Sequence, residues 1–371
     1  MNQDISDPIC STIRSRLLTW ADVSLRDLPW RQVRDPYRVW VSEIMLQQTR
    51  VETVIPYYER WMARFPTVEA LAQASLDDAL KCWEGLGYYA RCRNLHRAAQ
   101  NVVQRHDGRL SADREALIAL PGIGPYTVGA ILSLAFGQRA AVLDGNVRRV
   151  LSRVFALDDD PREAATRKRL WALAESLVPA EQAGRFNEAL MDLGATICVP
   201  KSPGCTGCPL REICRACAMG APENYPRSVR RAPTPHYVVA AGVIWRDGLL
   251  LIAQRPLEGL LGGMWEFPGG KREGGETLAE CLKRELREEM DIEVAVRGEL
   301  AVVRHAYTHF RVTVHALECA YRSGRAPKPI GVKDWRWVTL DELDDYAFPV
   351  VDQKIIAALR GPRQQTLPHL A

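Results

Sequence analysis

A tight turn followed by a carboxylate could act on a sugar that is joined to a phosphate. The turn reads Leu-Pro-Gly-Ile-Gly at residues 120–124, and Pro125 suits the first position of a following helix. Two glycines permit positive φ, and the amide groups at the new helix's N-terminus can bind an anion. Asp144 follows at the far end of that helix. An ordinary corner between two helices, with Asp144 as a capping residue, explains the turn alone equally well.

A second carboxylate, Glu43, lies in an apolar helical pattern formed by Val41, Ile44 and Met45. Burial there would raise the pKa of Glu43 and keep it protonated as a general acid. We expect Asp144, near helix N-termini, to stay ionised and to stabilise or attack a cationic sugar, as in glycoside hydrolysis. Without its neighbours, Glu43 would be interpreted as a surface salt-bridge partner.

Four of the ten cysteines fall within one short segment with the spacing C-x6-C-x2-C-x5-C, namely Cys198, Cys205, Cys208 and Cys214. Four thiolates in one loop suit a tetrahedral zinc ion or an iron–sulfur cluster. A zinc site could also use Cys217 and pair two C-x2-C units, although zinc ribbons usually separate such pairs by about 15–20 residues. The N-terminus has no signal-peptide pattern, so a disulfide framework is not expected.

The bulk composition is typical of a globular protein with two domains. The chain has 371 residues, of which 47% are hydrophobic and 25% charged, with a net charge of +4. No apolar run approaches the ~20 residues that a membrane span needs. We therefore expect a cytoplasmic protein that does not bind membranes. The excess of Arg over Lys permits nucleic-acid binding without establishing it.

Hydrophobic periodicity divides the chain into an all-α part and an α+β part. Residues 1–224 are predicted to be all-α, and residues 225–234, rich in proline and arginine, to be a linker. Residues 235–360 are predicted to be α+β, and residues 361–371 to be a disordered tail. The predicted helices of the first part cover 8–28, 36–62, 67–73, 76–82, 91–106, 113–119, 125–136, 145–155, 163–177 and 181–194. The second part has predicted strands at 238–245, 249–254, 293–304, 310–321 and 333–338, and helices at 277–290 and 350–360.

An acidic motif in the second part could bind a hard cation. It reads Gly270-x5-Glu276-x7-Arg284-Glu285-Leu286-x-Glu288-Glu289. On a helix, the glutamates at positions 285, 288 and 289 face one side, where Mg²⁺ could join them. A solvated acidic face paired with Arg284 and Arg287 is the alternative.

Several of these motifs resemble those of known DNA-repair enzymes. The cysteine spacing resembles the [4Fe–4S] loop of the endonuclease III superfamily, and residues 120–124 resemble its helix–hairpin–helix. The runs at residues 40–49 (WVSEIMLQQT) and 86–91 (LGYYAR) are similar to signatures of adenine DNA glycosylases of the MutY type. The acidic motif fits the Nudix box, with Asp291 in place of a glycine. Because a Nudix-like domain is part of that family, the resemblance covers essentially the whole chain.

The resemblance implies a monofunctional DNA glycosylase that flips adenine out of the duplex when it is mispaired with 8-oxoguanine or guanine. It implies a [4Fe–4S] cluster, double-stranded DNA as the partner, and a monomeric protein. The implied catalytic residues are Glu43, Asp144, Tyr126 and Asn146. The implied substrate-binding residues are Trp30, Arg31, Glu188, Gln48, Tyr88, Leu86, Gly122 and Gly124, together with the lesion-reading loop Tyr307, Thr308 and His309. Tyr88 could also be a plain exposed aromatic residue.

Position 126 separates the main alternatives. Lyase members of the superfamily carry a lysine there, whereas Tyr126 cannot form a Schiff base with the sugar. The alternatives are a bifunctional pyrimidine-lesion glycosylase/lyase, a Nudix-type nucleotide pyrophosphohydrolase with a DNA-binding appendage, and a lesion-binding protein without catalysis. The two carboxylates argue against the last of these.

Overall fold

The computed structural model describes residues 7–227, 233–322, 324 and 326–361, and it divides into two compact units. The first unit comprises Met1–Gln73 and Asn94–Arg231, and the second comprises Ala74–Arg93 and Ala232–Ala371. Half of the predicted linker (residues 228–232) and nearly all of the predicted tail (residues 362–371) lie outside the described residues, and the predicted domain boundaries remain a prediction. The fold class that we expected, a helical domain followed by an α+β domain, is confirmed.

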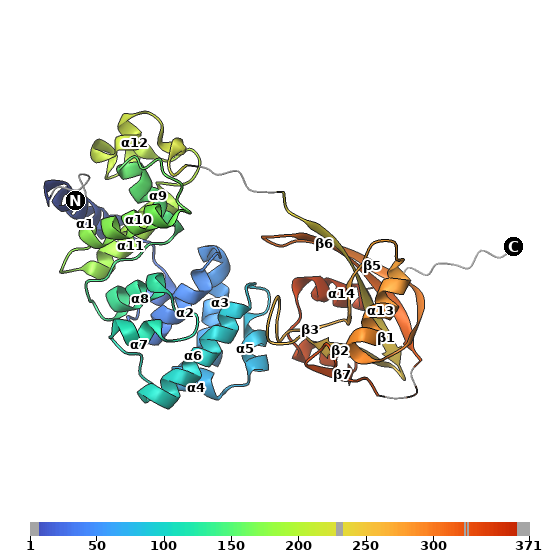
Figure 1. The fold of residues 1–371 in the computed structure, drawn as a ribbon. Coiled ribbons are helices and arrows are strands. Elements are labelled where there is room, and N and C mark those ends of the chain that lie inside the picture. Colours follow the sequence, from blue (N-terminus) through green and yellow to red (C-terminus); the bar gives the residue numbers. More distant parts are fainter. Residues whose placement is uncertain (1–6, 228–232, 323, 325, 362–371) are drawn as a thin grey trace. The chain divides into compact units, whose positions relative to one another are not determined.

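The first unit is helical (Figure 1). No helix in the described part of the chain is long and apolar enough to cross a membrane. The helices are α1 (Asp7–Ser24), α2 (Pro36–Leu46), α3 (Val51–Arg64), α4 (Val68–Gln73), α6 (Ala90–His106), α7 (Arg114–Ile118), α8 (Pro125–Ala130), α9 (Gly145–Val154), α10 (Ala164–Leu177), α11 (Ala183–Thr196) and α12 (Arg215–Ala218). Residues 90–93 of α6 belong to the second unit.

The single helical region predicted for residues 36–62 is wrong, because it is two helices. Asp35 caps α2 by accepting a hydrogen bond from the Arg38 amide at 2.9 Å, and Pro36 occupies the first helical position. The chain leaves α2 at Gln47, and Gln48 has φ +57°, which a right-handed helix cannot accommodate. Gln48 therefore lies in the exposed turn before α3 rather than on a helix face.

The predicted turn at residues 120–124 connects α7 to α8. Gly122 has φ +78°, and a Cβ at this position would lie 2.7 Å from the Cβ of Asn94. Only glycine fits both the conformation and the space. Gly124 then takes the N-cap position of α8, with Pro125 as its first residue. A short π-helical stretch, Ile131–Ala135, continues α8.

The main core of the first unit lies where α1, α9, α10 and α11 meet. Leu17, Leu151, Leu173 and Phe186 are buried there, one from each helix. Each such side chain contributes about 1.5–3 kcal/mol when it is removed from water. The helices that carry the polar groups of the site described below are therefore held by an apolar core behind them.

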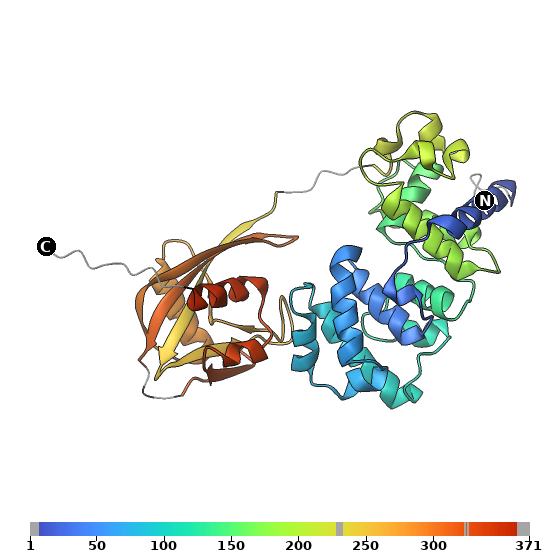
Figure 2. The ribbon, with the colours of Figure 1, turned by 180° about the vertical axis from the view of Figure 1, so that it is seen from behind.

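The second unit is built on a seven-stranded sheet (Figure 2). The strand order is β3-β2-β1-β6-β5, with β4 paired to β1 and β7 paired to β2, and only β1 and β6 run parallel. The strands are β1 (His236–Arg246), β2 (Leu249–Gln254), β3 (Trp265–Glu266), β4 (Gly269–Lys271), β5 (Val294–Ala306), β6 (Arg311–Tyr321) and β7 (Asp334–Val338). The sequence pattern missed β3 and β4 because two or three residues carry no periodicity.

Two helices cover the sheet from opposite sides. The side chains of α13 (Leu278–Met290) pack in one apolar cluster and those of α14 (Val350–Arg360) in another. Helix α5 (Leu76–Trp83) also belongs to this unit. Thr277 and Glu280 form a capping box at the start of α13, which stabilises a helix by about 1 kcal/mol. At its end, Asp291 adopts the left-handed conformation with φ +53°, and Lys328 pairs with its carboxylate at 2.7 Å.

Candidate active site

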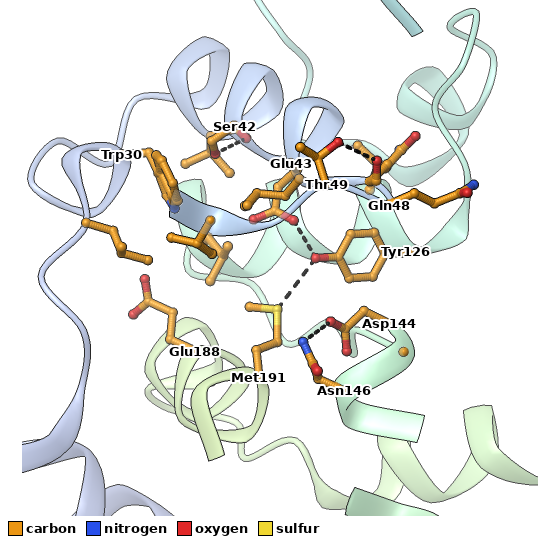
Figure 3. A pocket seen from close by; sticks show the side chains of 18 of the residues that line it. Trp30, Ser42, Glu43, Gln48, Thr49, Tyr126, Asp144, Asn146, Glu188 and Met191 are labelled. Atoms are coloured by element: carbon orange, nitrogen blue, oxygen red, sulfur yellow. Dashed lines mark hydrogen bonds between the residues drawn. The ribbon is translucent and has the colours of Figure 1, made fainter. Parts of the chain in front are cut away.

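Helices α2, α8, α9 and α11 of the first unit surround a pocket (Figure 3). Its volume is about 760 Å³, within the range of small-molecule sites. It brings together ten of the residues that we predicted for the site: Trp30, Arg31, Glu43, Gln48, Gly122, Gly124, Tyr126, Asp144, Asn146 and Glu188. These positions are far apart in the sequence, so the fold alone makes them neighbours.

Glu43 projects from α2 into this pocket and is only 3% exposed. Burial raises its pKa to about 7, and the negative charges of Asp144 and Glu188 act in the same direction. The hydrogen bond from Tyr126 and the positive charge of Arg31 oppose this rise. The result is a carboxyl group that is substantially protonated near neutral pH, as a general acid requires.

Tyr126 is the second residue of α8, so the helix–hairpin–helix turn determines its position. Its hydroxyl group donates a hydrogen bond to Oε2 of Glu43 and lies 3.5 Å from Sδ of Met191 (Figure 3). Burial, followed by the charges of Glu43 and Asp144, raises the pKa of the phenol well above its usual value. Tyr126 is therefore a hydrogen-bond donor at neutral pH and not a base.

Asp144 is the N-cap residue of α9. Its carboxylate accepts hydrogen bonds from the Val147 amide at 2.7 Å and from Nδ2 of Asn146 at 3.1 Å. We expected the helix N-terminus to hold this group in its ionised form. Burial raises the pKa of Asp144, whereas the hydrogen bonds from Val147 and Asn146 lower it, so whether Asp144 is ionised stays a prediction. The hydrogen bonds at the helix N-terminus thus favour the ionised form of Asp144, whereas burial disfavours it.

A chain of hydrogen bonds connects Asp144 to the cysteine-rich loop. Arg149 donates to Oδ1 of Asn146 at 2.8 Å and to the carbonyl oxygen of Cys198 at 2.7 Å. Arg153, one turn further along α9, lies 3.3 Å from Sγ of Cys198 and donates to the carbonyl oxygens of residues 198, 199 and 200. One helix therefore carries a site carboxylate at its first turn and holds the cysteine loop with its next two turns.

Helix α11 forms the opposite wall of the pocket with Glu188 and Met191, and it carries a second acidic residue, Asp192, one turn after Glu188. Glu188 lies 3.4 Å from Nε of Arg31. Asp192 is fully buried and accepts hydrogen bonds from the guanidinium groups of Arg26 and Arg31 and from the Arg26 amide. Although burial raises the pKa of Asp192, those arginines outweigh it and hold the pKa below its usual value. Asp192 therefore fixes the guanidinium of Arg31 beside Glu188.

The sequence pattern missed Asp192, Arg26 and Met191, although a signal for Asp192 exists. Asn187, Glu188 and Asp192 are polar residues on a helix whose other buried residues are apolar. Buried polar groups require partners, so such residues mark a built network. Trp30, which we did predict, is buried and contacts Tyr58 edge to face, with ring centroids 5.4 Å apart.

The four cysteines of the loop line one small cavity together with Cys217 and Arg153. The thiols are close enough to influence one another: burial raises the pKa of Cys208 to about 11, and Cys198, Cys214 and Cys205 add to this rise. Among the described residues, no group of three or more Cys, His, Asp or Glu converges closely enough to hold a single metal ion.

The remaining predicted residues belong to the second unit and do not line the pocket. Leu86 is buried, whereas Tyr88 is 37% exposed and has φ +49°. Tyr307, Thr308 and His309 lie in the loop between β5 and β6, where the ring of Tyr307 stacks on Phe310 at 4.7 Å. The hydroxyl groups of Tyr88 and Thr308 are within hydrogen-bonding distance.

Within the acidic motif, Arg284 forms ion pairs with three of the glutamates. Arg284 pairs with Glu276 at 2.8 Å, with Glu285 at 3.1 Å and with Glu288 at 3.2 Å. The bond from Arg284 is the largest cause that lowers the pKa of Glu276 to about 2. Glu289 has a buried oxygen without a hydrogen-bond partner among the described residues, and burial raises its pKa to about 7.

Comparison with protein families assigns the class of protein that this fold and site define. Residues 41–176 match the HhH-GPD superfamily of base excision DNA repair proteins, and residues 240–358 match the NUDIX domain. A thermostable thymine-DNA glycosylase of known structure is 33% identical, with a TM-score of 0.53 over 57% of this chain and 98% of that chain. An endonuclease III–DNA complex, 20% identical with a TM-score of 0.50, covers 58% of this chain and 98% of that chain and shows the shared helical fold. The class is therefore a base excision DNA glycosylase with a Nudix-like domain.

Similarity to curated proteins narrows this class to one family. The adenine DNA glycosylases of Rattus norvegicus and Mus musculus are 36% and 37% identical over 417 residues, covering 98% of this chain and 80% of each relative. That of Buchnera aphidicola (subsp. Acyrthosiphon pisum) is 42% identical over 201 residues, covering 54% of this chain and 57% of that relative. The chain belongs to the family of adenine DNA glycosylases of the MutY type, enzymes of base excision repair.

Proposed function

We propose that this adenine DNA glycosylase removes adenine mispaired with 8-oxoguanine or guanine, and that Glu43 and Asp144 carry the reaction. The observation that carries the assignment of residues is the pairing, in one pocket, of a buried Glu43 with a pKa of about 7 and an Asp144 at a helix N-terminus. Two carboxylates with different environments are the arrangement that cleavage of a glycosidic bond requires.

In the proposed reaction, the carboxyl group of Glu43 protonates a ring nitrogen of the extruded adenine. The bond between the sugar C1′ and the base then breaks, and its electron pair leaves with the base. Asp144 stabilises the resulting oxocarbenium-like sugar or attacks C1′, and Asn146 holds the orientation of Asp144. Water supplies the hydroxyl group of the abasic product. Tyr126 supports Glu43 through its hydroxyl group.

We assign the enzyme as monofunctional. A lyase needs an amine that attacks the sugar as a Schiff-base nucleophile. No lysine is present among the described residues that line the pocket, and position 126 carries a phenol. Adenine release without strand cleavage, in the absence of alkali, is the expected result. Efficient trapping of the wild-type protein on DNA by borohydride would contradict it.

The four cysteines fit a [4Fe–4S] cluster. Cys198, Cys205, Cys208 and Cys214 supply four soft thiolate ligands around one cavity. The cluster would supply no step of the reaction. Arg149 and Arg153 join the loop to α9, so the loop contributes to the support of Asp144. The family resemblance further implies that the loop helps to form a DNA-binding surface.

We assign the second unit as the reader of 8-oxoguanine through Tyr307, Thr308 and His309, with little or no nucleotide hydrolysis. The ion pairs of Arg284 with Glu276, Glu285 and Glu288 favour the interpretation of the motif as an acidic face paired with arginine. The test is Mg²⁺-dependent hydrolysis of 8-oxo-dGTP by the full chain. Turnover that Glu288→Gln abolishes would demonstrate a second active site and would contradict this assignment.

A further inference from the structure

A groove of about 450 Å³ lies beside the loop at residues 307–309, at the end of the sheet. It is formed by β1, β6 and β5, and its walls are His236, Arg304, His305, Ala306, Arg311, Val312 and Thr313. His236 is paired with Arg311, and Thr313 with Arg304, across neighbouring strands. Paired residues project to the same side of a sheet, so the two guanidinium groups lie on one face.

The charged side chains that line this groove in the described part of the chain are positive. Arg304 and Arg311 are exposed, and no acidic side chain lines the groove among the described residues. Neither guanidinium group has an ion pair or hydrogen bond within the part of the chain that the structure describes. By contrast, Arg246 at the other end of β1 pairs with Asp247 and lies over two aromatic rings. Exposed arginines without acidic partners are available for an anion from outside the chain.

The polar groups around the arginines suit an anion as well. His236 and Thr313 are hydrogen-bonded to each other at 2.9 Å, which gives the floor of the groove a fixed polar surface. Guanidinium forks match the geometry of phosphate oxygens better than any other side chain.

We propose that this groove, with Arg304 and Arg311 as its anchors, binds backbone phosphates of the DNA strand that carries the lesion. The inference rests on the proposed function, because the groove's residues immediately precede and follow the loop that we assign as the lesion reader. Phosphate contacts position a protein on DNA, whereas base contacts specify the sequence. The groove therefore holds the strand in register while residues 307–309 contact the base.

The test is the salt dependence of DNA binding by the full chain. The probe is a duplex with 8-oxoguanine opposite 2′-fluoro-2′-deoxyadenosine, whose glycosidic bond resists cleavage, and a matching duplex with guanine. Kd is measured between about 50 and 200 mM salt for the wild type and for Arg304→Gln, Arg311→Gln and the double variant. The slope of log Kd against log salt concentration should fall by about 0.9 for each arginine removed. Kd should rise by the same factor for both duplexes.

Three comparisons make the result decisive. Arg246→Gln removes the same charge outside the groove and should leave the slope unchanged. Arg304→Lys with Arg311→Lys should keep most of the slope, and it remains informative if the double glutamine variant does not fold. An unchanged slope in the double variant, or an effect confined to the 8-oxoguanine duplex, would overturn the proposal. Failure of the proposed function is separate: Thr308→Ala with His309→Ala would then leave the 8-oxoguanine preference intact.

Discussion

The hydrogen bond between Tyr126 and Glu43 determines which oxygen of the carboxyl group can carry a proton. The phenol donates to Oε2 of Glu43, so we expect the proton of the neutral acid on Oε1. A buried acid with this arrangement is ready to donate to a base in the pocket, and its pKa of about 7 places the neutral form within reach of physiological pH. Asp144, held by α9 instead, receives its hydrogen bonds from a helix N-terminus.

The two carboxylates should be separable from DNA binding. Glu43→Gln removes an acidic proton and Asp144→Asn removes a negative charge, each at nearly constant shape. Each variant should lose almost all adenine release, because these groups act on charge that develops in the transition state. Binding of an 8-oxoguanine:A duplex should change little. Single-turnover adenine release and equilibrium binding measure the two effects, and wild-type-like release by either variant would remove that residue from the mechanism.

The rate of adenine release should fall as pH rises through about 7, because Glu43 must be protonated to act as the acid. The Tyr126 hydrogen bond lowers the pKa of Glu43, whereas burial raises it. Tyr126→Phe removes the opposing effect, so the pKa of Glu43 should rise and the loss of activity should move to higher pH. Single-turnover pH profiles of both proteins give the comparison. A shift of the descending limb to lower pH would show that Glu43 is not the titrating acid.

At the level of elements, α11 determines the geometry of one wall of the pocket through a single buried carboxylate. Asp192 accepts hydrogen bonds from two arginines, and the Arg31 guanidinium that it holds lies beside Glu188. Removal of a charge from a buried pair leaves the partners without compensation.

Asp192→Asn should therefore destabilise the protein by about 3–5 kcal/mol, measured as the free energy of unfolding in denaturant. The matched control is Asp22→Asn. Asp22 also pairs with an arginine, Arg185, but its side chain is 64% exposed. The control should lose less than about 1 kcal/mol. Equal losses in the two variants would mean that burial of Asp192 is not what makes its network stabilising.

The five cysteines of the loop allow a test of which residues bind the cluster. Four of its five cysteines have the spacing that we assign to a cluster, and Cys217 is the fifth. The purified protein should be brown and contain about four iron atoms per chain. Cys208→Ser should lose iron, whereas Cys217→Ser should retain it. Stoichiometric zinc without iron after anaerobic preparation, or loss of metal on changing Cys217, would contradict the cluster assignment.

The sequence predicted those elements whose hydrophobic periodicity extends over several turns. It failed where the backbone conformation of one residue ends a helix. Gln48 continues the apolar spacing of α2, yet its positive φ ends the helix and starts a new one at Val51. The positions of Glu43, Tyr126 and Asp144 in one pocket follow from tertiary packing, which no local pattern encodes. Burial raises the pKa of Asp144, an effect that its position at a helix N-terminus in the sequence does not reveal.

At the scale of the whole molecule, the two units have separate roles in the function that we propose. The first contains every residue of the pocket that could cleave the glycosidic bond, and the second contains the loop at residues 307–309. Residues 74–93, which include Tyr88, belong to the second unit although they precede most of the first in sequence. The hydrophobic pattern shows helices in this segment but not the unit to which they belong.

The division predicts that substrate preference and chemistry can be changed separately. Thr308→Ala with His309→Ala should weaken the preference for 8-oxoguanine:A over G:A, because hydrogen-bonding groups for the oxidised base are lost. Adenine release from G:A at saturating protein should be nearly unchanged, because the pocket is intact. The ratio of single-turnover rates and affinities for the two duplexes measures this. An unchanged ratio would show that the loop does not read the lesion.

The most direct test of the account is one duplex with a single 8-oxoguanine:A pair, incubated with the wild-type chain and with Glu43→Gln. Adenine release is measured first, and strand cleavage without alkali is measured in the same samples. We predict that the wild type releases adenine and leaves the strand intact, and that Glu43→Gln releases almost no adenine and also leaves the strand intact. Strand cleavage by the wild type, or adenine release by Glu43→Gln at the wild-type rate, would contradict the assignment of a monofunctional glycosylase that uses Glu43 as its acid.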